Sequence, residues 1–412
     1  MITSIRRIRQ AALLAAATTL LGTVTGCGTS PDQRSLEGGE GDSAAARSAP
    51  SHVAQRPFTL VATGDILSHD SVIRQARTDA GGSGYDFRKM LSGAKPLASG
   101  ADLAICHMET VYGREGGPFT GYPAFQTPPH VAAAIKDTGY ESCSTASNHT
   151  LDAGVDGVRR TLTAMDKAGL KHVGSARSAK ERTRPAVMTA GGAKVAQLAY
   201  TYGTNGIPVP DKKPWLVNPI EPKRIIADAR AARRAGADIV VVSLHWGTEW
   251  QQAPDQQQIS VAKQLTRSRS GGRKDLDLII GTHAHVPQPY EKVNGTWVVY
   301  GMGDQLAGKM NDPRGSMSSA ARFTFEPPDD DDSDDDNAGG RGGRSAGKQG
   351  EWTVEKAEFI PYLVQTSPRI DVINLSSAAN RAAGTDRATA YRTIRTAVLS
   401  EGAARQGLRM GE

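Results

Sequence analysis

The stretch LIIGTHAH at residues 278–285 places two histidines, His283 and His285, directly after a run of apolar residues. A run of Leu and Ile without polar alternation is typical of a strand that is covered on both faces of its sheet. In α/β proteins, ligands bind outside the carboxyl ends of such strands. The stretch therefore predicts a buried strand that delivers two imidazoles to a ligand-binding edge of a sheet.

The same pattern of short apolar runs, separated by helical patterns, extends over residues 57–325. Strands are predicted at 58–63, 103–106, 195–200, 239–244, 276–280 and 297–300. Helices are predicted at 131–138, 155–168 and 222–235. Alternating strands and helices favour a layered α/β fold in which helices cover the sheets.

Polar side chains follow the apolar runs in six places. These candidate ligands are Asp65, His107, Glu109, Asn148, His149, His245, His283, His285 and Asp304. Five of the nine histidines of the chain are among them, which makes a chance arrangement improbable. Imidazole, carboxylate and amide oxygen together suit manganese, iron or zinc better than calcium. The sequence therefore predicts a divalent metal site at one rim, with His69 as a further candidate because it lies close to Asp65.

The N-terminus has the pattern of an export signal. A basic segment at residues 6–9 precedes an apolar run at 11–21, which is too short to span a bilayer comfortably. The residues VTGC at 24–27 resemble a bacterial lipobox, in which the cysteine carries acyl chains. We therefore predict a lipoprotein signal peptide at 1–27, with Cys27 anchoring the chain to the extracytoplasmic face of the cell membrane. An ordinary signal peptide or an N-terminal anchor is the alternative.

Two other segments have biased composition. Residues 28–56 are rich in Gly, Ser, Ala and charged residues, and are interpreted as a flexible tether. Residues 327–350 contain the acidic run DDDDSDDD at 329–336, which lacks the ligand pattern of an EF-hand. We interpret this segment as a solvated, disordered insert between two paired strands at 323–325 and 352–354.

The remaining boundaries follow from length and composition. The chain has 412 residues, enough for one large or two modest domains, and we place the main domain at 57–375. The Ala- and Arg-rich region at 376–412 is predicted to be a helical extension. The net charge is +6, but the basic residues form no block and do not alternate with aromatic residues. This pattern argues against a nucleic-acid partner.

Besides Cys27, the chain has only Cys106 and Cys143. Cys106 ends the strand predicted at 103–106, just before His107, and Cys143 lies in a further predicted strand segment at 142–147, just before Asn148. Outside the cytoplasm the two can pair, because disulfides persist there. Two buried free thiols are an equally good interpretation, and the sequence does not decide between them.

Four motifs make the comparison with a known family specific. They are GYPAFQTPP at 121–129, SNHTLDAG at 147–154, HWGTE at 245–249 and GTHAHVPQPYE at 281–291. In this order they resemble the CapA family of poly-gamma-glutamate synthesis proteins. The resemblance covers about residues 58–325 and the strands after the acidic insert. The family is similar to the calcineurin-like metallophosphatases, which implies a four-layer α/β/β/α sandwich.

The resemblance also implies roles for the candidate residues. Asp65 would be a ligand from the first strand, and Asn148 would bind through its amide oxygen. His149 would act as general acid or charge stabiliser, while Glu109 would bind the metal or orient a ligand. The remaining ligands that the resemblance implies are His245, His283 and His285.

Three positions depart from the expected pattern. Metallophosphatases usually carry Asp-x-His on the first strand, whereas Asp65 is followed by Ile66 and Leu67. His107 and Asp304 each stand where the family has Asn. Both are further candidate ligands, and the sequence is compatible with one bound ion or with two.

Three functions are compatible with the resemblance. The first is a part in making or exporting a poly-gamma-glutamate capsule or a related envelope polymer. Its partners would be polyglutamate synthase or export subunits and the anionic polymer itself. The second is a metal-dependent phosphoesterase, in which the ion binds water and orients its attack. The third, a tethered binding protein with a vestigial site, explains the many potential ligands least well. Whether the chain is an enzyme stays open at this point.

Overall fold

The computed structural model describes residues 54–328 and 350–412. The predicted signal peptide, Cys27, nearly all of the tether and nearly all of the acidic insert lie outside the described residues. Within the described part of the chain, no helix combines the length and apolar character that a membrane span requires.

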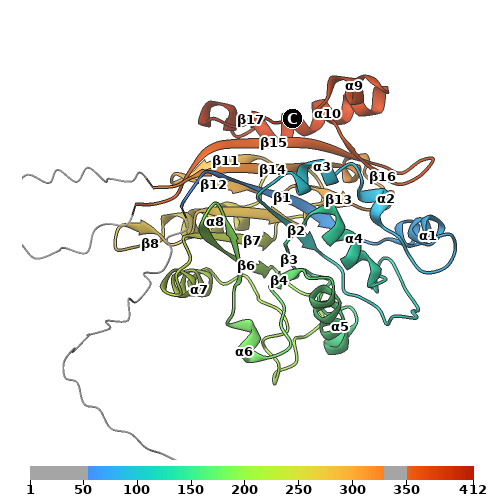
Figure 1. Cartoon of the computed structure of the whole chain (residues 1–412), viewed down its shortest axis with the longest axis horizontal. Coiled ribbons are helices and arrows are strands. Elements are labelled where there is room, and N and C mark those ends of the chain that lie inside the picture. Colours follow the sequence, from blue (N-terminus) through green and yellow to red (C-terminus); the bar gives the residue numbers. More distant parts are fainter. Residues whose placement is uncertain (1–53, 329–349) are drawn as a thin grey trace, which may run out of the picture. The chain divides into compact units, whose positions relative to one another are not determined.

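The first of two large sheets carries both ends of the described chain (Figure 1). Its main path runs β16-β15-β14-β1-β2-β3-β4, while β13 pairs with β1 and β17 pairs with β15. The strands are β1 Phe58–Ile66, β2 Leu103–Met108, β3 Ser142–Ser144, β4 Lys171–Val173, β13 Asp304–Leu306, β14 Met317–Glu326, β15 Thr353–Gln365, β16 Asp371–Asn374 and β17 Arg409–Met410. The strands β1, β2, β3 and β4 are parallel, and β13 is parallel to β1. Their carboxyl ends therefore meet at one edge.

The second sheet has the order β11-β12-β10-β7-β6-β5. Its strands are β5 Ala186–Ala190, β6 Ala193–Thr201, β7 Ile239–His245, β10 Leu278–Thr282, β11 Tyr290–Val293 and β12 Thr296–Val299. The central strands β6, β7, β10 and β12 are parallel. A separate hairpin is formed by β8 Arg269–Ser270 and β9 Arg273–Lys274.

Helices cover the outer face of each sheet. Apolar side chains of five helices pack against the first sheet: α1 Asp70–Asp79, α2 Arg88–Leu91, α3 Lys95–Ser99, α4 His130–Thr138 and α5 Gly154–Lys167. Two helices pack against the second sheet: α7 Pro222–Arg234 and α8 Gln256–Arg267. A further core lies between the two sheets. The structure thus confirms the predicted four-layer α/β/β/α sandwich.

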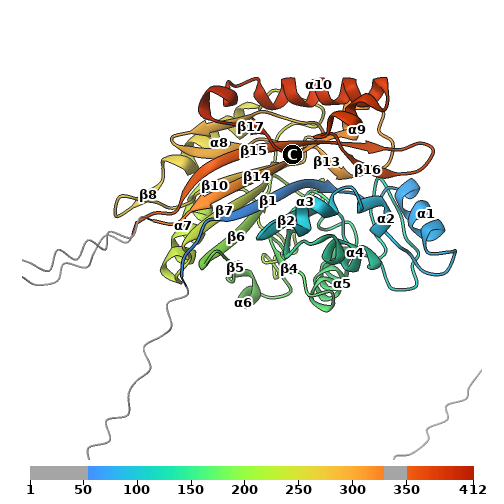
Figure 2. The same ribbon diagram turned by 45° about the horizontal axis from the view of Figure 1, so that its top comes forward.

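The C-terminal region adds α9 Ala378–Ala382, α10 Thr385–Leu399 and a short 3-10 turn at Ala403–Gln406 before β17. Buried residues of α10, among them Ile394 and Val398, join the core between the sheets. Figure 2 shows α10 running along β15. The small helix α6 Ala179–Arg182 and a 3-10 turn at Pro313–Ser316 complete the described elements.

The predicted elements are confirmed with shifted ends. Residue 65 lies inside β1 and residue 107 inside β2, so both strands continue into the site instead of stopping before it. The strand predicted at 276–280 begins and ends two residues later, as β10. The predicted pairing across the acidic insert is also confirmed, since Phe325 of β14 lies opposite Val354 of β15.

Candidate metal centre

Strand register brings the candidate residues to one rim. On the first sheet, Asp65 of β1 lies between His107 of β2 and Asp304 of β13. On the second sheet, His245 at the end of β7 lies beside Thr282 at the end of β10. The parallel ends of both sheets therefore point their polar side chains towards a shared space.

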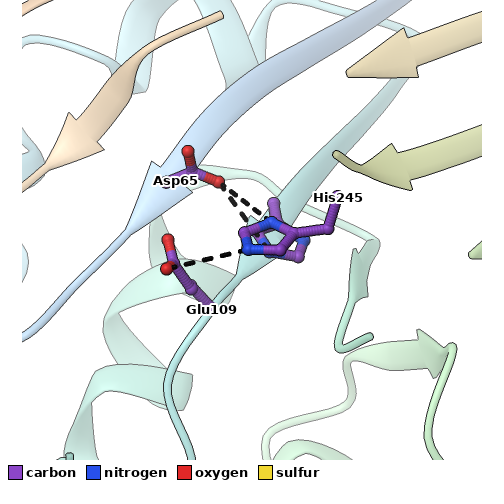
Figure 3. Close-up of side chains that lie close together, drawn as sticks. Asp65, Glu109 and His245 are labelled. Carbon is purple, nitrogen blue, oxygen red and sulfur yellow. Dashed lines mark ion pairs between the residues drawn. The ribbon is translucent and has the colours of Figure 1, made fainter. Parts of the chain in front are cut away.

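The deepest group in this space consists of Asp65, His107, Glu109 and His245, which we call the deep cluster. One ligand atom from each lies within 4.8 Å of the others, and all four residues are buried. Asp65 Oδ1 is 3.8 Å from His107 Nε2 and 3.9 Å from His245 Nδ1. Glu109 Oε1 is 3.8 Å from His245 Nε2. In Figure 3 the carboxylates of Asp65 and Glu109 both face the His245 ring.

Several ligand atoms of the deep cluster have no hydrogen-bond partner among the described residues. They are Asp65 Oδ1, His107 Nε2 and both carboxylate oxygens of Glu109. A buried carboxylate without a partner destabilises the fold, because burial removes its hydration and no hydrogen bond replaces it. A divalent cation would satisfy all four atoms at once. The deep cluster therefore fits a divalent metal site, as the sequence predicts, although it does not identify the metal.

Burial shifts the pKa values of all four residues of the deep cluster towards their neutral forms. Burial raises the pKa of Asp65 to about 7, and burial also raises the pKa of Glu109 well above its usual range. Burial lowers the pKa of His107 to about 3. The pKa of His245 is also lowered, by burial and by the neighbouring histidines. Neutral imidazoles are the form that binds metals.

Hydrogen bonds to side chains orient the histidines of the deep cluster. His107 Nδ1 is 2.7 Å from Ser144 Oγ, so Nε2 points to Asp65. His245 Nδ1 is 3.0 Å from Thr282 Oγ1. Such bonds to the second ring nitrogen fix the orientation of metal-binding histidines. Asn148 reaches the same place, since its Oδ1 is 2.9 Å from His245 Nε2.

His283 and His285 approach from the turn after β10. The backbone N–H of His283 donates to Asp65 Oδ2 at 3.0 Å. His285 Nδ1 lies 2.8 Å from Asp304 Oδ1, and its Nε2 lies 3.9 Å from Glu109 Oε1. Burial lowers the pKa of His285, but the carboxylates of Asp304 and Glu109 outweigh it and hold this pKa well above its usual value.

His149 lies beside the deep cluster, at a pocket of about 470 Å³. Its Nδ1 is 2.7 Å from Asp152 Oδ2, and the Phe125 backbone N–H donates to the same oxygen at 2.8 Å. Asp152 therefore fixes the His149 ring, and Nε2 is the nitrogen that can meet a ligand. The pocket is lined by Leu67, His69, Tyr122, Phe125, His149, Glu249, Trp250, His285, Lys309, Met310, Asn311 and Asp312.

All of the residues predicted for the metal site lie together at this rim, while their individual roles stay predictions. The further candidate His69 lines the pocket with His149 and His285, and its Nδ1 accepts from the Gly308 N–H at 3.1 Å. Sequence reasoning missed Asp152, Glu249 and the rim aromatic Tyr202, whose ring lies 4.4 Å from that of His283. Asp152 and Glu249 stand inside the quoted motifs, so a signal for them was present.

The two cysteines that the sequence left open form a disulfide. Cys106 of β2 lies directly opposite Cys143 of β3, with 4.5 Å between their Cα atoms. The disulfide is one residue before His107, so it joins the two strands where they enter the site.

Solved structures with a similar fold include phosphoesterases. A 5′-nucleotidase precursor from Thermus thermophilus is 14% identical with a TM-score of 0.44, over 85% of this chain and 60% of that one. The calcineurin-like phosphoesterase YfkN from Bacillus subtilis is 13% identical with a TM-score of 0.40, over 83% of this chain and 99% of that one. At these values the likeness says nothing about activity.

Relatives of known name are closer in sequence. The PGA biosynthesis protein CapA of Bacillus subtilis is 32% identical over 181 residues, 43% of this chain and 46% of that protein. The capsule biosynthesis protein CapA of Bacillus anthracis is 28% identical over 174 residues, 42% of this chain and 41% of that protein. The matched segments thus span less than half the length of these relatives.

The family model of the bacterial capsule synthesis protein PGA_cap matches residues 59–309. This segment covers more than half of the chain and contains every residue predicted for the metal site, from Asp65 to Asp304. The chain belongs to the PGA_cap family of bacterial capsule synthesis proteins.

Proposed function

We propose that this protein takes part in making or exporting a poly-gamma-glutamate capsule or a related envelope polymer, and that its deep cluster holds a divalent cation for this work. The family match over residues 59–309 carries the proposal, because the whole candidate site lies inside it. The names of the two CapA relatives support the same process. Manganese, iron or zinc suits the mixed oxygen and nitrogen ligands.

The proposed location rests on the sequence alone. Acylation of Cys27 would hold the folded part at the extracytoplasmic face of the membrane, on a tether formed by residues 28–56. There the protein would meet polyglutamate synthase or export subunits and the growing anionic chain.

Asp65, Glu109 and His245 would hold the cation, with Asn148 and His107 beside them. A cation bound there would act as a Lewis acid towards an anionic oxygen of the substrate. The chain itself excludes water from the deep side of the site, because the ligand residues are buried. The pocket beside His149 and His285 leaves one side open to a ligand.

The gene offers a direct test in the bacterium that encodes this chain. A deletion strain would be complemented with the wild type, with His245→Ala or with His172→Ala, which changes a histidine on β4 outside the site. Polymer is measured as glutamate released by acid hydrolysis of the washed envelope and of the medium. We expect polymer to return with the wild type and His172→Ala, but not with His245→Ala. The role of the site would be contradicted if the His245→Ala protein accumulated to the wild-type level and the strain still made the wild-type amount of polymer.

The pair of His149 and Asp152 favours a second candidate, a metal-dependent phosphoesterase. Because Asp152 holds Nδ1, His149 Nε2 is positioned at the pocket, where it can give a proton to a leaving oxygen. His285 lines the same pocket, so the proton donor and one of the candidate ligands face the same space.

Hydrolysis of simple phosphomonoesters and phosphodiesters separates the two candidates. We expect a phosphoesterase to lose about 10²–10⁴-fold in kcat with His149→Ala, the usual contribution of a positioned proton donor, and nothing with His172→Ala. A wild type that binds metal stoichiometrically but hydrolyses no ester would contradict the phosphoesterase and leave the assembly role.

A further inference from the structure

A groove lies on the outer face of the first sheet, between helices α4 and α5, which run side by side there (Figure 1, Figure 2). It has a volume of about 600 Å³. Its walls are the first turn of α4, the second half of α5 and residues 113–115 of the loop after β2. It shares no lining residue with the deep cluster or with the pocket beside His149, so it is a separate place on the molecule.

One side of the groove is apolar. It consists of small side chains, namely Pro129, Ala132, Ala133, Ala164 and Ala168. Ala164 and Ala168 also pack against the buried core of the first sheet, whereas Ala133 is exposed. Because these side chains are small, they leave room beside them, and methylene groups of a ligand placed there would be removed from water.

The charged side chains of the groove are mostly basic. The basic side chains that line it are Arg114, Arg159, Arg160 and Lys167. The acidic side chain among its lining residues is Glu115 alone. Arg159 lies 3.7 Å from Asp156, whereas Arg114 and Lys167 form no ion pair with any described residue. A surface with this excess of positive charge attracts anions.

Two hydrogen bonds fasten the loop after β2 to α5 and orient one of the basic groups. The Tyr112 N–H donates to Thr161 Oγ1 at 2.8 Å, and Arg160 Nε donates to the Tyr112 carbonyl at 3.1 Å. The remaining N–H groups of the Arg160 guanidinium have no partner among the described residues and are free for a ligand. Lys167 follows seven residues later, about 10 Å along the same helix face. The groove thus offers positive charges at successive points.

The segment between β2 and α4 connects the groove with the pocket beside His149. Phe125 lines the pocket, and Pro129 lines the groove. The Gly113 N–H donates to the Thr127 carbonyl at 2.9 Å, which holds the two arms of this segment together. A chain-like ligand that is longer than the pocket can therefore continue along this segment into the groove.

We propose that this groove binds an anionic polymer whose carboxylates are separated by methylene groups, and that it does so without the metal centre. The basic side chains would pair with the carboxylates, while the alanine side would cover the methylene groups. Poly-gamma-glutamate has this chemistry, because each residue carries a free carboxylate and two methylene groups in its backbone. The inference rests on the proposed function and names the surface that would hold the growing chain.

Binding of fluorescent poly-gamma-glutamate to the full-length protein tests the groove. Anisotropy is measured in the presence of EDTA, so that no divalent cation contributes, and at low and high salt. Arg114→Glu with Lys167→Glu reverses the two cations that have no ion-pair partner. Ala133→Trp fills the groove without a change of charge. The matched control is Lys263→Glu with Arg267→Glu, the same charge change at exposed positions of α8 over the other sheet.

We expect the Arg114 and Lys167 double variant to bind about tenfold more weakly, because two attractions become repulsions. Ala133→Trp should also bind more weakly, the control should bind like the wild type, and salt should weaken all binding by screening. The groove is wrong if either groove variant binds like the wild type, or if the control loses as much affinity as the double variant.

The outcome is independent of the test of the proposed function. A wild type that does not bind the polymer in EDTA overturns the groove, but leaves the complementation result with His245→Ala as it is. Conversely, if deletion of the gene leaves the amount of polymer unchanged while the groove variants lose binding, the proposed function is wrong and the groove stands as a binding site for a carboxylate polymer.

Discussion

Asp65 is held in a position where a carboxylate needs a positive partner. It is buried, its Oδ2 accepts one backbone N–H from His283, and its Oδ1 has no hydrogen-bond partner among the described residues. Burial raises its pKa to about 7 for the same reason. A cation removes this cost, so binding should stabilise the fold.

We therefore expect metal to raise the free energy of unfolding of the wild type but not of Asp65→Asn. A ligand at a thousandfold excess over its Kd contributes about 4 kcal/mol, and most of this gain should be lost in the variant. Urea unfolding with and without Mn²⁺ or Zn²⁺ measures the difference. Asp137→Asn, at an exposed position, serves as control. An equal response of Asp65→Asn and the wild type would contradict the role of Asp65.

Asp152 is expected to stabilise the fold as well as to orient the His149 ring. Asp152→Ala leaves the Phe125 N–H and His149 Nδ1 without their shared acceptor, and a buried polar group without a partner costs about 1–3 kcal/mol. Asp152→Asn keeps one acceptor oxygen and should cost less. Thermal unfolding compares both with Asp156→Ala on the exposed side of α5. Equal stability of Asp152→Ala and Asp156→Ala would show that these hydrogen bonds are unimportant.

Among the strands, the close approach of β1 and β13 determines where Asp304 lies. The Asp65 N–H donates to the Gly303 carbonyl at 3.0 Å, and a Cβ on Gly64 would lie 1.8 Å from that oxygen. Only glycine allows the two backbones to meet here. The approach places Asp304 opposite Asp65 and within reach of His285.

Gly64→Ala should therefore push β1 and β13 apart, and this should lower both the stability of the fold and the affinity for metal. We expect a loss of about 1–3 kcal/mol in unfolding free energy, typical of an overpacked core, and weaker metal binding. Gly116→Ala is the control, because a Cβ there meets no atom within 4 Å. Unfolding curves and a Co²⁺ titration measure both effects. Normal metal affinity in a destabilised Gly64→Ala would show that β13 does not position the site.

The disulfide between β2 and β3 should stabilise the same edge. It closes a segment with a sequence separation of 37 residues, for which removal costs about 2–4 kcal/mol. Replacing both Cys106 and Cys143 by Ala should lower the free energy of unfolding, measured with urea, by this amount. A reductant should destabilise the wild type but not the variant. Two titratable thiols in the unreduced, unfolded wild type would contradict the pairing.

The molecule as a whole shows which parts of the site a sequence can predict. Asp65, His245 and His283 are recognisable as candidates because each comes at the end of an apolar strand, and parallel strands bring such ends to one edge. The family resemblance adds the four-layer arrangement, which strand patterns alone do not specify. Local sequence therefore predicts which of these side chains meet at the rim, while their roles in binding a metal stay predictions.

What sequence could not predict depends on contacts between distant segments. Glu249 stands in the HWGTE motif, but the motif does not show that a hydrogen bond from the Trp250 N–H to the Ala284 carbonyl joins its loop to the turn that carries the histidines. The predicted strand ends are misplaced for a related reason. The strands β1 and β2 extend through residues 65 and 107 because they pair with each other there, which is a tertiary effect.

Anchoring of the whole protein is tested through Cys27. If this residue carries acyl chains, the wild type should partition into the detergent phase after separation with Triton X-114, and Cys27→Ala should not mature at this position. Ser30→Ala serves as control. Labelling with radioactive palmitate measures acylation directly. Equal partitioning and labelling of Cys27→Ala and the wild type would contradict the proposed anchor.

The central claim is that side chains from both sheets coordinate one cation, and anomalous diffraction tests it most directly. Crystals grown with Mn²⁺ or Zn²⁺ should show an anomalous peak about 2.0–2.3 Å from ligand atoms of Asp65, Glu109 and His245. The absence of a peak there, with the two carboxylates satisfied by hydrogen bonds to neighbouring side chains, would contradict the account.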